Sequence, residues 1–151
     1  MGNFLHDFVS GAEHLDITAV EQALAIKFPE DLVAFWNKHQ GGWPENDIFN
    51  YTDMYGVAND GQVMSFLLLN KQEGEMVRQT LSLRKEGRVL DCHVVIADEA
   101  GGHKILYNSD DGKIYVWDHE NEDVMPKNCY PVGNNFTHFF NDVLHKLEMD
   151  D

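Results

Sequence analysis

The chain of 151 residues carries 26 acidic and 11 basic side chains, which gives a formal net charge of -15 at pH 7. A field of this sign repels phosphate backbones and argues against direct nucleic-acid binding. The length and the hydrophobic content of 43% are typical of one globular domain, which we expect to comprise residues 1–151. The sequence contains neither a bilayer-spanning apolar run nor the features of a secretion signal. We therefore expect a cytoplasmic protein that does not act at a membrane.

Three short helices are predicted in the first part of the chain. The apolar side chains among residues 4–8 favour a short helix that packs on the domain's own core, with docking on a partner as the alternative. Thr18 and Glu21 have the spacing of a capping box, so the next helix is predicted to begin there and to break before Pro29. Pro29 suits the first turn of a further helix, which should end at the two glycines 41–42. One face of this last helix is formed by Leu32, Phe35, Trp36 and His39.

The middle of the chain gives weaker signals. Residues 43–60 are irregular in pattern, with one possible strand near residues 48–51. Residues 63–69 form an apolar run that is typical of a buried strand. Residues 76–88 are predicted to form a helix, because Val77 and Leu81 are four positions apart.

A β-meander is predicted next, from three short apolar runs at residues 94–97, 104–107 and 113–117. Residues 109–112 separate the last two runs with a loop that contains Gly, which is typical of a hairpin. These runs indicate antiparallel neighbours in one sheet.

The chain closes with the strongest helical pattern in the sequence. Asn135 is a suitable N-cap. The apolar residues behind it follow a 3.6-residue period: Phe136, Phe139, Phe140, Val143, Leu144 and Leu147. We predict that Trp36, Trp117, Phe136 and Phe140 belong to the core, because each lies on an apolar stripe or strand.

Motifs for catalysis or metal binding are weak. Asp118, His119 and Glu120 are adjacent and have groups suited to acid and base chemistry, but no nucleophile motif accompanies them. The interpretation that they stabilise the turn after Trp117 is favoured. Glu122 and Asp123 extend an alternation that faintly resembles a calcium loop, but the required Gly and the final Glu are missing. A solvated acidic loop is the simpler interpretation.

Cysteine and histidine spacing also gives no metal site. Cys92 and Cys129 lie far from any CxxC spacing and are predicted to be buried reduced thiols. The eight histidines show no zinc-ligand spacing. We therefore expect no catalytic residue, no metal and no cofactor, and a protein that is not an enzyme.

Charge is unevenly distributed along the chain. Residues 98–123 contain eight acids and two bases, Lys104 and Lys113, for a net charge of -6. Because these acids lie at strand ends and turns of one meander, we expect them to project from one edge and to contact a partner, with an ordinary solvated surface as the alternative. They are Asp98, Glu99, Asp110, Asp111, Asp118, Glu120, Glu122 and Asp123. The one basic cluster in the sequence consists of Arg78, Arg84, Lys85 and Arg88.

Three stretches of the sequence form an ordered pattern. The first stretch comprises ITAVEQAL at residues 17–24, FPEDL at 28–32 and HQGG at 39–42. The second joins IADEAGGHKIL, from residue 96, to GKIYVWDHE, from residue 112, and the third is the terminal helix that begins NF at residue 135. Taken in this order, they resemble the SUKH superfamily, which includes fungal regulators of cell-wall synthesis and many bacterial immunity proteins. Gln40 and Asn135 depart from the residues that the family often has at these turn and cap positions, but both are polar.

The resemblance implies an α+β domain with a central, mostly antiparallel sheet flanked by helices, and a function in binding another protein. In bacteria that function is typically the neutralisation of a cognate toxin, often a nuclease. The resemblance supplies no catalytic motif and no contact residues.

The leading hypothesis is therefore an immunity protein that binds a basic, nuclease-type toxin domain and masks its active site. An intracellular regulatory or scaffold module with a different protein partner is the alternative. A metal-dependent hydrolase built on Asp118, His119 and Glu120 is a third hypothesis from another class.

Overall fold

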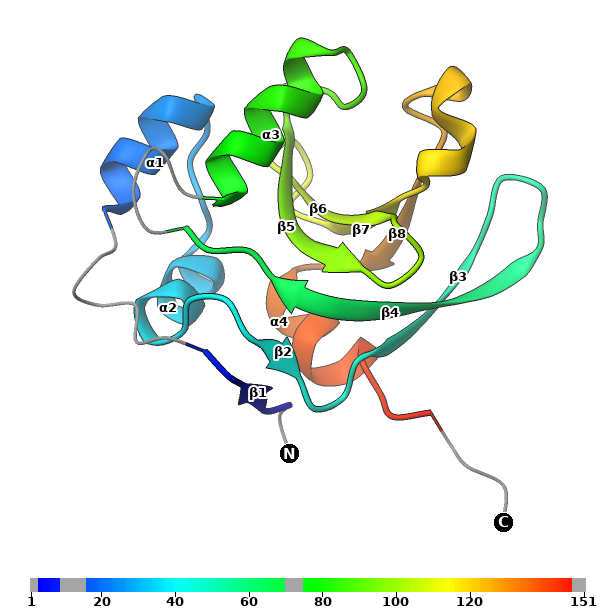
Figure 1. The fold of residues 1–151 in the computed structure, drawn as a ribbon, viewed down its shortest axis with the longest axis horizontal. Helices are drawn as coiled ribbons and strands as arrows, with labels where there is room; N and C mark the ends of the chain where they lie inside the picture. The colour runs from blue at the N-terminus through cyan, green and yellow to red at the C-terminus, as the bar shows by residue number, and fades with distance from the viewer. Residues whose placement is uncertain (1–2, 9–15, 70–74, 148–151) are drawn as a thin grey trace.

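A six-stranded antiparallel sheet forms the centre of the computed structural model, which describes residues 3–8, 16–69 and 75–147 (Figure 1). Each strand pairs with its neighbour in sequence: β3 (Ile48–Thr52), β4 (Ala58–Phe66), β5 (His93–Glu99), β6 (Lys104–Asn108), β7 (Ile114–Trp117) and β8 (Cys129–Gly133). A two-stranded sheet joins β1 (Leu5–His6) to β2 (Trp43–Pro44). The expected α+β class with a central antiparallel sheet is confirmed.

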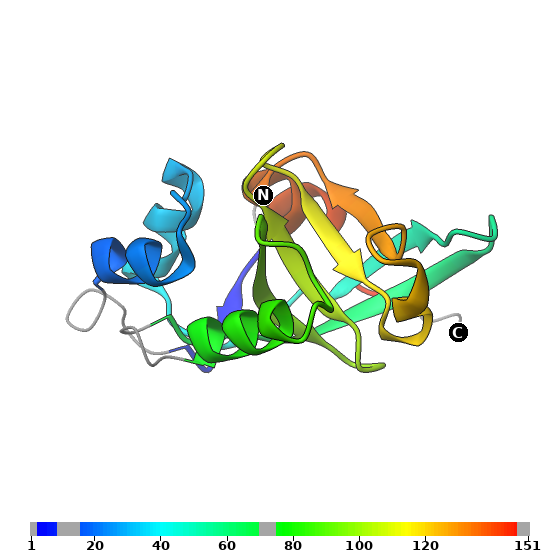
Figure 2. The ribbon, with the colours of Figure 1, turned by 90° about the horizontal axis from the view of Figure 1, so that it is seen from above.

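Helices cover both faces of this sheet. They are α1 (Ile17–Leu24), α2 (Glu30–Lys38), α3 (Glu75–Lys85) and α4 (Phe136–His138), which continues into the π-helical turn η2 (Phe139–Val143). The 3-10 segment η1 (His119–Val124) follows β7. In Figure 2, α3 and α4 lie on opposite sides of the sheet. None of the helices among the described residues has the length and apolar character needed to cross a membrane.

The sheet curls so that its first and last strands also touch. Tyr51 of β3 and Tyr130 of β8 stack with ring centroids 5.6 Å apart. Phe139, on the helical side of the curl, packs against Phe49 of β3. Trp36, Trp117, Phe136 and Phe140 are all buried, which confirms the predicted core residues.

The predicted N-cap of α4 is confirmed, because the Asn135 side chain accepts a hydrogen bond from the His138 N–H, but the caps of α1 and α2 differ from the prediction. Asp16, not Thr18, is the N-cap of α1, and its carboxylate accepts a hydrogen bond from the Ala19 N–H. Glu21 accepts instead from the Phe28 N–H at 2.7 Å, so no capping box forms. Pro29 is the N-cap residue of α2, one position before its first turn, where its fixed φ is equally acceptable.

The two glycines after α2 do not cap it. The helix ends at Lys38, and His39 is already extended. Gly42 has a φ of +86°, and a Cβ there would lie 2.6 Å from the His6 carbonyl oxygen. Gly42 is therefore required because the backbone of β1 passes too close to it for any side chain, and not because it ends the helix.

Both ends of the described chain also depart from the predicted helices. Residues 5–6 form a strand, and Phe4 and Phe8 are exposed instead of packing on the core. The final helix stops at Val143, and His145 then exchanges two backbone hydrogen bonds with Ile48. Leu147, predicted to lie on the apolar face, is 61% exposed.

One strand, β4, begins earlier than predicted, and another, β8, was not predicted. β4 begins at Ala58, five residues before the apolar run, because polar residues there pair with β3 in a hairpin that reaches beyond the rest of the sheet (Figure 1). β8 contains Pro131, which is tolerated on an edge strand. The predicted elements near residues 48–51 and 76–88 and the meander with its hairpin loop are confirmed. Cys92 and Cys129 are free thiols, although only partly buried.

Truncation of Phe140 to Ala is expected to reduce the free energy of unfolding by about 3–5 kcal/mol, because its ring packs against Phe35, Phe66 and Phe136. Denaturant titration followed by tryptophan fluorescence measures this loss. Phe4→Ala is the control, since that ring is 64% exposed and its removal should change stability by less than about 0.5 kcal/mol. Equal stabilities of the two variants would contradict this assignment of the core.

Candidate functional site

The eight acids predicted at one edge separate into two groups. Asp98 and Glu99 end β5, and residues 118–123 follow the end of β7. Strand register places these segments at the same end of the sheet, because Lys104 pairs with both Asp98 and Trp117. Asp110 and Asp111 lie in the β6–β7 loop at the opposite end. The acids 98–123 therefore do not form one continuous edge.

A hollow of about 530 Å³ lies at the end of the sheet that holds the larger group. It contains five carboxylates and neither Lys nor Arg, and we call it the acidic hollow. Its lining residues are Tyr51, Asp53, Tyr55, Asn59, Asp60, Glu99, Gly101, His103, Asp118, Glu120 and Asn121. Asp98 and Asp123 belong to the neighbouring segments but do not line it, and the Glu122 side chain lies outside the part of the chain that the structure describes.

Asp53 and Asp60 were missed by sequence reasoning. They lie in the β3–β4 hairpin, some forty or more residues before the acids at the end of β5 and β7. Val63 pairs with Glu99 at the end of β5, so the part of β4 before Val63 extends past that end and brings Asp60, and Asp53 in the preceding turn, to the hollow. The only sequence signal was local, since Asp53 and Gly56 are residue types that favour a turn.

Asp118 shapes one wall of the acidic hollow. Its buried carboxylate accepts hydrogen bonds from the Glu120 N–H, the Asn121 amide at 2.6 Å and the Tyr130 hydroxyl at 3.0 Å. Burial alone would raise the pKa of Asp118, but these donors, together with His103, hold its pKa below the ordinary value of 3.8. The carboxylate is thus ionised at neutral pH and holds the turn after Trp117, as the structural interpretation of residues 118–120 predicted.

Glu99 has a similar structural function in the lining of the acidic hollow. It is nearly fully buried and accepts hydrogen bonds from the N–H groups of Gln62 and Gly101. Glu120 and Asp60, by contrast, are exposed. The exposed carboxylates are accessible to solvent, and the buried ones fix the backbone around them.

The tip of the β3–β4 hairpin forms the outer rim. Asp53 accepts from the N–H groups of Val57 and Tyr55, and these bonds hold its pKa below the ordinary value. Tyr55 is 71% exposed, and its hydroxyl donates to the side-chain Oδ1 of Asn121 at 3.3 Å. Tyr is enriched at protein interfaces, so Tyr55 is suited to contact a partner from this rim.

Two histidines separate the acidic hollow from the neighbouring surface. The Nδ1 atoms of His103 and His119 are 2.8 Å apart, and the His119 N–H also donates to His103 Nδ1 at 3.2 Å. His103 Nδ1 is therefore the acceptor and His119 Nδ1 the donor. Within the described residues, no group of three or more His, Cys, Asp or Glu side chains is arranged to hold a metal ion.

The substitution Asp118→Asn is expected to lower the free energy of unfolding at pH 7 by about 1–3 kcal/mol, because an amide cannot accept all three hydrogen bonds. The folded pKa of Asp118 lies below 3.8, so its contribution is present above that pH and is lost as pH falls through the folded pKa. The stability difference between wild type and variant should therefore shrink below about pH 4.

Thermal or denaturant unfolding at several pH values measures this difference. Glu120→Gln is the matched control, since its exposed side chain lies two residues away in the same turn. A gap between wild type and Asp118→Asn that stays constant from pH 7 to pH 3 would rule out the ionised, hydrogen-bonded state of Asp118.

The comparison with known proteins agrees with the fold. No curated protein matches the chain significantly. Residues 11–142 match the SMI1 / KNR4 family (SUKH-1), a range that includes the strands β2 to β8, the helices α1 to α4 and every residue of the acidic hollow. The chain belongs to the SMI1 / KNR4 family (SUKH-1).

Proposed function

We propose that this protein, acting as one domain, is an immunity protein that binds a basic toxin domain through the acidic hollow and so neutralises it. The observation that carries the proposal is the hollow itself, in which five carboxylates from three segments line one concavity without a Lys or Arg. Membership of a family that includes immunity proteins supports the same function.

Electrostatics explain why such a concavity suits a nuclease-type toxin. An enzyme that binds phosphates must present Lys and Arg at its active site, and these side chains match a carboxylate-rich surface. The exposed Glu120 and Asp60 gain from such a match, because no Lys or Arg among the lining residues neutralises them. Complementarity of this kind chiefly raises the association rate and weakens as salt screens the charges.

An intracellular regulatory or scaffold module remains the second candidate, since the same surface can hold a basic protein that is not a toxin. The third hypothesis, a metal-dependent hydrolase, is not supported by the geometry of residues 118–120. Asp118 points into its own turn, His119 contacts His103 and Glu120 is exposed, so the three groups do not converge. We therefore propose a non-enzymatic cytoplasmic function without a cofactor.

Neutralisation can be tested directly. The genes beside this one in the native host are expressed singly in a reporter bacterium, and any that arrests growth is co-expressed with this protein. Restored growth, together with a purified complex of the two proteins, is the expected result. Growth arrest by a neighbour that this protein neither relieves nor binds would contradict the immunity function, and capture of a basic non-toxin partner instead would favour the regulatory alternative.

Charge reversal then tests the surface. Glu120→Lys should slow association with the partner on the order of threefold or more at low salt, and the difference should shrink at high salt. Asp110→Lys is the matched control, because it makes the same charge change at an exposed site on the opposite end of the sheet. Stopped-flow or surface-plasmon measurements at two ionic strengths give both rates. If the two variants slow association equally, net charge rather than the acidic hollow governs binding.

His119→Ala separates binding from catalysis. The variant loses the contact with His103 but keeps every carboxylate of the acidic hollow, so neutralisation is expected to persist. Growth rescue and metal analysis of the purified protein provide the readout. A folded His119→Ala protein that fails to neutralise but still binds its partner, or wild-type protein with stoichiometric zinc, would favour the hydrolase.

A further inference from the structure

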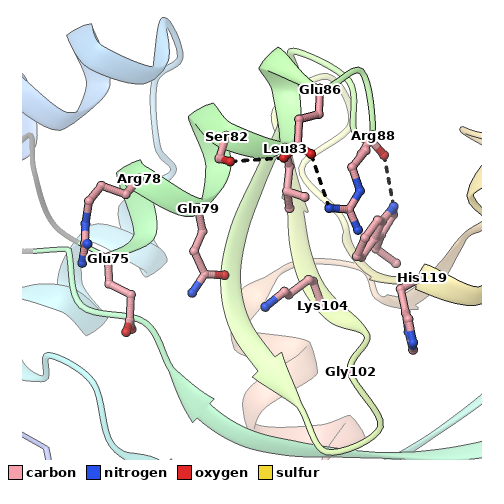
Figure 3. A pocket seen from close by; sticks show the side chains of 11 residues that line it. Glu75, Arg78, Gln79, Ser82, Leu83, Glu86, Arg88, Gly102, Lys104 and His119 are labelled. Carbon is pink, nitrogen blue, oxygen red and sulfur yellow. Dashed lines mark hydrogen bonds and ion pairs between the residues drawn. The ribbon is translucent and has the colours of Figure 1, made fainter.

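A second concavity, of about 660 Å³, lies between α3 and the face of the sheet that α3 covers. Figure 3 shows Glu75, Arg78 and Gln79 along α3, Lys104 of β6 across from them, and His119 at the far end. We call it the α3 groove. Its lining residues are Glu75, Arg78, Gln79, Ser82, Leu83, Glu86, Arg88, Gly102, Lys104, Trp117 and His119.

This groove reverses the sign of charge found in the acidic hollow. The chain contains three arginines, and all of them lie in α3 or the turn that follows it. Arg84 is turned inward, where its guanidinium donates to the carbonyl oxygens of Leu24 and His93. Arg78 and Arg88 line the groove together with Lys104. Three of the eleven basic side chains, including both arginines that are not turned inward, thus line one concave surface.

The three cations differ in how firmly they are held. Lys104 Nζ lies 2.7 Å from Asp98 Oδ1. The Cζ atom of Arg88 lies 5.2 Å from the centroid of the Trp117 ring. One of its guanidinium nitrogens, Nη1, is 3.8 Å from Glu86 Oε2. The Arg78 side chain is exposed, and within the described residues its guanidinium has no hydrogen-bond or ion-pair partner. Arg78 is therefore the cation most available for a ligand.

We propose that the α3 groove binds an extended, acidic segment of a protein partner. Guanidinium groups recognise carboxylates through paired hydrogen bonds, which suits Arg78 and Arg88 to this ligand. The eleven residues of α3 rise about 16 Å, which matches roughly five residues of extended peptide. Glu75 and Glu86 favour a peptide over a polyphosphate, because a peptide offers N–H donors to these carboxylates whereas a dense anion is repelled by them.

The side chain of Gln79 gives a further reason to expect a peptide ligand in the α3 groove. Its amide oxygen is buried and has no partner in the described part of the chain, an arrangement that costs free energy. Rotation of the amide toward a backbone N–H in the groove removes that cost. The groove is separate from the acidic hollow, since their lining residues do not overlap, so this inference does not depend on the proposed function.

The test uses ¹⁵N-labelled protein and three probes: the peptide (Asp-Glu)₃, its neutral counterpart (Asn-Gln)₃, and tripolyphosphate. The Trp117 indole N–H, which donates to the Arg88 carbonyl oxygen at 3.1 Å, gives a separate resonance beside the groove. Saturable shifts of this resonance and of the amides of residues 78–88 are expected with the acidic peptide alone.

Arg78→Glu should weaken binding of the acidic peptide by roughly tenfold. Lys113→Glu is the matched control, with the same charge change at an exposed site outside the groove, and should leave binding nearly unchanged. Absence of saturable shifts, equal losses in both variants, or tripolyphosphate binding as tight as that of the peptide would each overturn the proposal. Because no toxin or native partner enters this experiment, its result is independent of the test of neutralisation.

Discussion

The hydrogen bonds that converge on Asp118 hold together the part of the structure on which the candidate site depends. Its carboxylate joins the turn after β7 to Tyr130 of β8, and its backbone N–H and C=O both bond to Asn128. Tyr130 in turn stacks on Tyr51 of β3, so one buried charge links both edges of the curled sheet. A buried carboxylate is stable only when it is fully hydrogen-bonded. Loss of these hydrogen bonds would therefore free the turn after Trp117, which forms one wall of the acidic hollow.

The carboxylates around Asp118 create the charge that the proposed function uses. Asp53, Asp60 and Glu120 lie around one concavity, and their mutual repulsion would be relieved by the basic partner that we propose. The burial of Glu99 and Asp118 fixes the backbone, so the exposed acids are positioned before the partner arrives. The α3 groove, with the arginines, lies beyond the histidine contact, and the two surfaces give the molecule faces of opposite local charge.

Much of the fold could be predicted from residue patterns, because the meander strands are apolar runs bounded by Gly and Asp and need no distant partner to be recognised. The start of β4 and all of β8 could not, since polar residues 58–62 and the Pro131 segment form strands only by pairing with neighbours. The terminal helix was predicted too long because its apolar period continues past Val143. In the structure the helix ends there, and His145 forms backbone hydrogen bonds with Ile48 instead. The candidate site was predicted in part: the acids after Trp117 were found, but Asp53 and Asp60 reach the hollow only through the register of β4 with β5.

Hydrogen–deuterium exchange of the protein alone and in complex with its purified native partner tests the central claim most directly. If the acidic hollow is the contact surface, peptides covering residues 51–60 and 118–124 will gain protection in the complex, while the β6–β7 loop at residues 108–113 will exchange as in the free protein. Protection confined to residues 108–113 or to the β1–β2 region, with the rim of the acidic hollow unchanged, would contradict the account.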